Sequence, residues 1–182
     1  MNEVVTIILT IIVFIGVIAV IYILAYNNLQ AYTIKINEAE SIIDELLRKK
    51  YDLLLHMQKI ITTKVKLDKK IFADLKDLKN KNISSYDFER KITEFNNLIN
   101  QIKRDHSSLE ESKDFNKDLE SILAINEKLE ASKTFYNKYT SHLNKAIKKF
   151  PSNIIAKIHH MKLRAYFDGK DMFDDNTNDF KT

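Results

Sequence analysis

The sequence predicts an all-α protein, in which an N-terminal single transmembrane helix is followed by an antiparallel up-and-down four-helix bundle. Three observations predict this fold class. Residues 4–26 contain no charged residue, no histidine and no proline. The rest of the chain carries apolar residues spaced alternately four and three apart, as on one face of a coiled-coil helix. The 182 residues include only 2 Gly and 1 Pro, too few for the frequent turns of an all-β fold.

Residues 4–26 are long enough to span a membrane. A helix rises ~1.5 Å per residue, so this segment reaches roughly 35 Å, and the hydrocarbon core of a bilayer is ~30 Å thick. Tyr22 and Tyr26 lie near its C-terminal end, where aromatic rings favour the membrane interface. A cleaved signal peptide, the first alternative, would begin with basic residues, but the first charge here is Glu3. The second alternative is a helix in the core of a soluble domain. Such a helix usually has a polar face for water, which this segment lacks.

Basic residues flank the predicted span on one side only. No Lys or Arg precedes it, whereas Lys35, Arg48, Lys49 and Lys50 follow it. Cytoplasmic flanks of membrane spans carry the excess of Lys and Arg. We therefore expect a single-pass protein of the cell membrane, with the N-terminus outside and the helical domain in the cytoplasm.

Composition and motifs restrict the function classes. The net charge of +4 suits contact with anionic lipid but is too weak to indicate nucleic-acid binding. The absence of cysteine excludes disulfides, thiol chemistry and a lipoprotein anchor. The sequence has no Gly-rich phosphate loop, no G-x-S-x-G and no H-E-x-x-H motif. We expect no enzyme, no catalytic, cofactor-binding or metal site, and no cofactor.

Residues 27–151 are expected to form the bundle. Its first helix should continue from the span, with an apolar face interrupted at Lys50 and Lys64. The β-branched run at residues 60–63 weakens a helix and predicts a turn near Thr62, which gives four helices. Without that turn a three-helix bundle results. The apolar face of this part consists of Tyr32, Ile36, Ala39, Ile43, Leu46, Leu53, Met57, Ile60, Leu67 and Ile71.

Capping residues predict where the later helices begin and end. Ser84 paired with Asp87, or Ser85 alone, can cap the helix that follows a polar break. Asp114 is the expected N-cap of the last long helix, and Pro151 should end it. Polar Asn126, Lys133 and Thr140 interrupt the apolar face of that last helix. The apolar positions of both helices are Phe88, Ile92, Phe95, Ile99, Ile102, Phe115, Leu119, Ile122, Leu129, Tyr136, Leu143, Ile147 and Phe150.

Residues 152–167 combine apolar and basic side chains after Ser152, a candidate cap of a short helix. Two interpretations stay open. The segment lies on the inner leaflet as a basic amphipathic element, or Ile154, Ile155 and Ile158 close the base of the bundle core. On the first interpretation the membrane-surface residues are Ile154, Ile158, Met161, Lys157, Lys162 and Arg164.

Two features resemble metal sites only superficially. Adjacent helical residues such as His159 and His160 point ~100° apart and cannot readily chelate one ion. Residues 174–179 lack the glycine of a calcium loop. We expect a basic surface pair for the first feature and a disordered acidic tail over residues 168–182 for the second.

One group of residues resembles the C-terminal signature of the LemA family: Phe135, Tyr136, Asn137, Asn144, Phe150, Pro151, Ser152 and Asn153. The resemblance extends from Tyr26-Asn27 to about Phe167. It departs from the family at Glu40, where Trp is usual, and at Asn126, where glutamate is usual. The resemblance implies a bacterial single-pass membrane protein with a four-helix soluble domain and no known catalytic activity. We expect Asn137 and Asn144 to have structural roles in hydrogen bonding.

These observations together predict a membrane-anchored helical-bundle scaffold or interaction protein. Its expected partners are membrane lipid and unidentified proteins, including further copies of the chain, but not nucleic acid. The alternative function is binding or remodelling of membrane lipid through residues 152–167.

Overall fold

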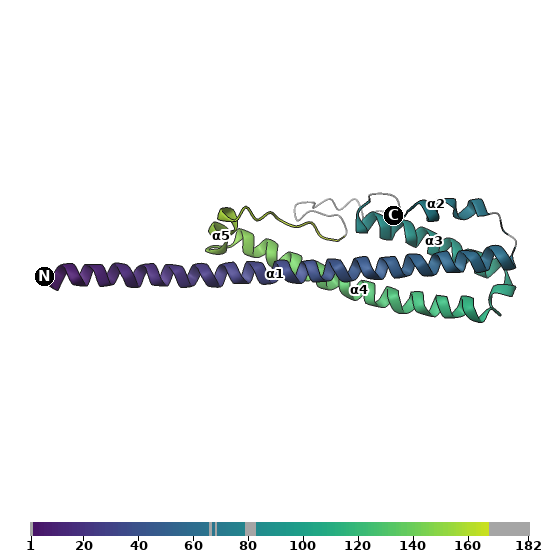
Figure 1. Cartoon of the computed structure of the whole chain (residues 1–182), viewed down its shortest axis with the longest axis horizontal. Coiled ribbons are helices and arrows are strands. Elements are labelled where there is room, and N and C mark those ends of the chain that lie inside the picture. Colours follow the sequence, from purple (N-terminus) through teal and green to yellow (C-terminus); the bar gives the residue numbers. More distant parts are fainter. Residues whose placement is uncertain (1, 66, 68, 79–82, 168–182) are drawn as a thin grey trace, which may run out of the picture. The chain divides into compact units, whose positions relative to one another are not determined.

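The computed structural model describes residues 2–65, 67, 69–78 and 83–167 of the chain (Figure 1). No strand occurs among these residues, and the prediction of an all-α helical fold is confirmed. Short 3₁₀ turns lie at Lys69–Phe72 and Ser107–Leu109. The helices are α1 (Asn2–Lys64), α2 (Ala73–Asp77), α3 (Ser85–Asp105), α4 (Lys113–Lys148) and α5 (Ser152–Ile158).

Helix α1 contains the apolar N-terminal segment and continues past it without a break, as predicted. Its most apolar window has no share buried inside the protein, so the alternative of a buried core helix is wrong. By length and composition α1 can cross a membrane.

The turn predicted near Thr62 is confirmed, since α1 ends at Lys64. That turn implied a second bundle helix before the polar break, and this prediction is wrong, because the described residues there form only a 3₁₀ turn and the five-residue α2. Phe72, Leu75 and Leu78 are buried and lie three residues apart. A spacing of three matches the 3₁₀ period better than the α-helical one, which suits a short, tightly wound element.

The predicted helix starts are only partly correct. Ser84 caps α3 as predicted: its Oγ accepts from the amide of Asp87 at 3.1 Å and donates to the carboxylate of that residue at 2.8 Å. Helix α4 begins at Lys113, so Asp114 lies in its first turn rather than at the N-cap. The predicted cap at Ser152 is also wrong, because α5 begins at this residue and has no side-chain cap.

The chain divides by its contacts into two compact units. The first unit contains Met1–Glu38 and Phe135–Thr182, and the second contains Ala39–Thr134. The domain boundaries expected at residues 26, 151 and 167 rest on the end of the apolar segment, on Pro151 and on the start of the acidic tail, and they stay predictions.

The core of the second unit departs from the predicted apolar face by one residue. Leu54 and Ile61 are buried, in place of the expected Leu53 and Ile60. An α-helix has 3.6 residues per turn and drifts against a strict spacing of 3.5, so a long apolar face shifts sideways along the helix. Lys50, which interrupts the predicted face, is buried as well. The apolar core of this unit consists of Ala39, Ile43, Leu46, Leu47, Tyr51, Leu54, Met57, Ile61, Phe72, Leu75, Leu78, Ile92, Ile99, Ile102, Leu109, Phe115, Ile122 and Leu129.

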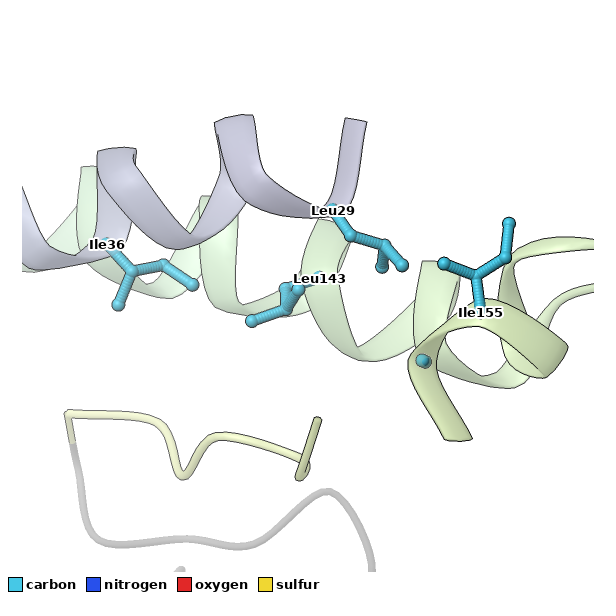
Figure 2. Close-up of a cluster of buried hydrophobic side chains, with 5 residues drawn as sticks. Leu29, Ile36, Leu143 and Ile155 are labelled. Carbon is cyan, nitrogen blue, oxygen red and sulfur yellow. The ribbon is translucent and has the colours of Figure 1, made fainter. Parts of the chain in front are cut away.

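The core of the first unit is a small cluster contributed by three helices. Figure 2 shows Leu29 and Ile36 of α1 facing Leu143 of α4 and Ile155 of α5. Each of these side chains is at most 3% exposed. Phe150, which was also expected in the core, is 73% exposed because it lies in the turn after α4 has ended. This cluster holds α5 against α1 and α4.

Candidate functional site

Helix α5 divides its side chains between the core and the surface of the first unit. Ile155 and Ala156 are buried, whereas Ile154 and Ile158 are 51% and 59% exposed. Lys157 is exposed as well. Of the three isoleucines that could close the core, only Ile155 does so. The other two leave an apolar surface with a cation beside it.

The remaining membrane-surface candidates are not all on that surface. Lys162 is exposed, but Met161 is partly buried against the core of the first unit. Arg164 is also partly buried, and its Nη2 donates a hydrogen bond to Oδ1 of Asn37 at 3.1 Å. The structure therefore separates Met161 and Arg164 from the exposed side of α5.

His159 connects the end of α5 to the last turn of the predicted span. Its Nε2 lies 2.7 Å from the hydroxyl of Tyr22, and its ring centroid lies 4.6 Å from that of Tyr26. Its neighbour His160 has a φ of 51° and is exposed. The two histidines thus have separate environments, and α5 lies level with the aromatic end of the apolar segment.

Three residues of α4 hold residues 163–167, a segment with no helix or strand, which we call the strap. Asn144 Nδ2 donates to the carbonyl of Arg164 at 2.8 Å, and Asn144 Oδ1 accepts from the amide of Arg164 at 2.9 Å. Asn137 Oδ1 accepts from the amide of Phe167 at 2.8 Å. The Tyr136 hydroxyl donates to the carbonyl of Ala165 at 3.3 Å. The sequence predicted structural hydrogen bonds for the two asparagines but could not identify the segment that they bind.

The other signature residues lie in the turn that joins α4 to α5. Pro151 and Ser152 are partly buried, whereas Asn153 is exposed. The amide of Asn153 donates to the carbonyl of Lys149 at 2.9 Å, which connects the two helices through the main chain. This turn brings α5 back against the core of the first unit.

An aromatic patch covers part of the surface of the first unit. Phe135 is 38% exposed, and its ring centroid lies 4.5 Å from that of Tyr139. Tyr32 and His142 stack nearby, with centroids 5.6 Å apart. Lys35 Nζ lies 6.0 Å from the centroids of both Phe135 and Tyr139, within reach of a cation–π contact. We call these five residues the aromatic patch.

A cluster of charges lies inside the second unit. Lys133 Nζ lies 2.8 Å from Glu89 and 2.5 Å from Glu130. Burial lowers the pKa of Lys133, but its hydrogen bonds with the two glutamates outweigh this effect and raise the pKa above the ordinary lysine value. Lys50 is only 4% exposed, and this burial lowers its pKa despite the attraction of Glu89. Two of the polar interruptions seen in the sequence, Lys50 and Lys133, are therefore parts of one charged cluster.

A second polar contact of this unit had no signal in the sequence. Nδ1 of the exposed His56 lies 2.5 Å from the carboxylate of the buried Asp118. A pair separated by this much chain cannot be recognised from spacing alone. Within the described ranges, no group of three or more His, Asp or Glu side chains is placed to hold a metal ion. Residues 174–179, the superficial calcium-loop match, lie outside those ranges.

The fold defines a helical protein whose N-terminal helix can span a membrane. The model of the LemA family matches residues 39–178, and the chain belongs to the LemA family. This match includes all the C-terminal signature residues. It begins at residue 39 and therefore does not include Tyr26-Asn27, where the resemblance starts. Neither the curated proteins nor the solved structures contain a match to the chain.

Proposed function

We propose that this LemA-family protein is a membrane-anchored scaffold that presents helical surfaces to partner proteins. The continuity of α1 carries the proposal. One unbroken helix contains both the apolar segment and the residues that form the helical cores, such as Leu29 and Ile43. A helix of this kind ties a folded, partner-binding domain closely to the bilayer. The proposal assigns no catalytic step, in keeping with a sequence that has no nucleophile–base or metal-binding motif.

The aromatic patch supports binding of proteins, including further copies of this chain. Aromatic side chains contribute a large share of the energy at protein interfaces, because they bury much area with few rotatable bonds. The amine of Lys35 lies near the rings of Phe135 and Tyr139, so the patch offers both an apolar and a cationic contact.

Proximity labelling tests the scaffold proposal in the native membrane. A labelling enzyme fused to the C-terminus of the full chain should enrich a reproducible set of membrane and membrane-adjacent proteins. The double variant Phe135→Ala/Tyr139→Ala should lose part of that set. The matched control Leu123→Ala removes an exposed apolar side chain outside the patch. A set equal to that of an unrelated single-pass anchor would contradict the proposal.

A second candidate function is binding or remodelling of membrane lipid by residues 152–167, and the position of α5 favours it. Its end bonds to Tyr22, which lies about 6 Å before Tyr26 along the helix axis. An α5 held at this level would lie near the headgroup boundary of a bilayer spanned by α1. There its exposed Ile154 and Ile158 would contact the acyl chains, and Lys157 the lipid phosphates.

A single tryptophan reports on the lipid candidate, because the chain contains no Trp. In vesicles with anionic lipid, Ile158→Trp should be quenched by brominated acyl chains. The control Tyr86→Trp, at an exposed position of α3, should be quenched much less. Equal quenching at the two positions, or no quenching at Ile158→Trp, would rule out the lipid candidate.

A further inference from the structure

The two asparagines of α4 match the repeat of an extended peptide. Asn137 and Asn144 lie seven residues apart, which corresponds to ~10.5 Å along a helix. Their partners Arg164 and Phe167 lie three residues apart, which corresponds to ~10 Å in extended chain. The two carboxamides are therefore spaced to bind main-chain groups that lie three residues apart in a segment running along this face of α4.

The contacts of this face are mainly with the main chain. Asn144 uses both its donor and its acceptor on Arg164, as a neighbouring strand would. Asn137 and Tyr136 add contacts to one amide and one carbonyl further along. Every peptide carries these groups, so the contacts do not depend on the side chains of the bound segment.

Two side chains of the strap supply selectivity. Arg164 reaches Asn37 of α1, and the ring of Phe167 meets the ring of Tyr136 edge to face with centroids 6.1 Å apart. A segment that fits the face therefore has a basic residue followed, three positions later, by an aromatic residue.

The strap is bound by contacts that can exchange. Each of residues 163–167 is exposed or only partly buried. Hydrogen bonds between partly exposed groups contribute little net free energy, since water replaces them when they open. Segments held in this way belong to the low-stability part of a fold.

We infer that the α4 face formed by Tyr136, Asn137 and Asn144 is a binding site for extended peptides of the form basic-x-x-aromatic, and that the strap occupies it in cis. This inference rests on the proposed scaffold function and deepens it by giving the chemistry of one partner class. Because the strap is tethered, its effective concentration is high, and a free peptide competes only when the strap is weakened.

The test uses the full chain in lipid nanodiscs and a fluorescent peptide with the sequence of residues 161–167. Arg164→Pro removes the amide that donates to Asn144, because proline has no N–H group. This variant should bind the peptide at least about tenfold more tightly than the wild-type chain, a factor in the range expected for losing the contacts of one residue. Phe167→Ala, which keeps the main chain intact, should show a smaller gain.

Modified peptides and a second substitution identify the contacts. N-methylation of the peptide at the amide equivalent to Arg164 should weaken binding to the Arg164→Pro chain by about tenfold. N-methylation at the position of Ala165 should change peptide binding little, because the amide of Ala165 makes no hydrogen bond within the described part of the chain. Adding Asn144→Ala should abolish the gain.

Two results would overturn the inference. The first is equal peptide binding by the wild-type chain and by both weakened variants, with helix content unchanged. The second is a gain that Asn144→Ala and N-methylation leave intact. Neither result would contradict the scaffold proposal, because partners found by proximity labelling could bind at the aromatic patch.

Discussion

At the scale of single residues, Lys50 is the most informative position of the second unit. Burial lowers its pKa, so the folded protein holds its charged form at a cost that Glu89 and Glu130 only partly offset. Replacing a buried charge by an apolar side chain of similar length is often stabilising. We expect Lys50→Met to raise the free energy of unfolding by about 1 kcal/mol. Urea unfolding of the full chain in detergent, followed by circular dichroism, measures this change, and a clear loss of stability would contradict it.

The same residue predicts a dependence of stability on pH. The folded pKa of Lys50 is lower than its unfolded value of about 10.4, so between these two values the unfolded state binds more protons. The wild-type chain should therefore gain stability relative to Lys50→Met as the pH rises through this alkaline window. Comparing the two chains cancels the opposite contribution of Lys133, whose pKa is raised. A stability difference that does not vary with alkaline pH would show that Lys50 is not desolvated.

Lys133 should respond in the opposite way to the same substitution. Its removal leaves Glu89, whose side chain is 16% exposed, without its hydrogen-bonded cation. An unpaired charge in such a place costs more than the pair contributes. We expect Lys133→Met to lower the free energy of unfolding by about 2 kcal/mol, and Lys128→Met, at an exposed position of the same helix, to change it little. If both variants unfold at the same urea concentration, the ionic cluster does not stabilise the second unit.

At the scale of secondary-structure elements, α4 offers a matched pair of neighbours. Ile122 is 1% exposed and Leu123 is 57% exposed. Truncation of the buried side chain removes apolar contact and leaves a cavity, so Ile122→Ala should cost about 3 kcal/mol. Leu123→Ala should change the free energy of unfolding by less than about 0.5 kcal/mol. Similar losses for both variants would mean that the second unit packs α4 in another rotation about its axis.

Much of the helix pattern was predictable, because it depends on local chemistry. The β-branched run near Thr62 and the capping pair of Ser84 and Asp87 act within a few residues, and both predictions are confirmed. The burial of Leu54 and Ile61 in place of Leu53 and Ile60 was not predictable, since it depends on how far a long apolar face drifts around its helix. The short α2 was missed for a related reason: the sequence signals where a helix stops but not how the next segment packs.

The strap shows a further limit of the sequence. The signature asparagines were expected to form structural hydrogen bonds, yet side-chain amides can bond to almost any polar partner. The segment that they bind, around Arg164 and Phe167, has no regular pattern of its own. Only the fold brings it alongside α4.

At the scale of the whole molecule, the orientation in the membrane is a prediction that single cysteines can test, because the native chain has none. A membrane-impermeant maleimide should label Glu3→Cys in intact cells, whereas Lys128→Cys should be labelled only after the membrane is opened. The reverse pattern would place the helical domain outside. A mature chain that begins after residue 26 would show that the apolar segment is a cleaved signal.

The unbroken course of α1 has a mechanical consequence. A span that is too long for its bilayer adjusts by tilting, and packing against neighbouring spans sets its rotation about its long axis. Since α1 continues without a break from the apolar segment to Leu29 and Ile36, such a tilt or turn reaches these two core residues. The thickness and crowding of the surrounding lipid would then set the direction in which the attached side chains point.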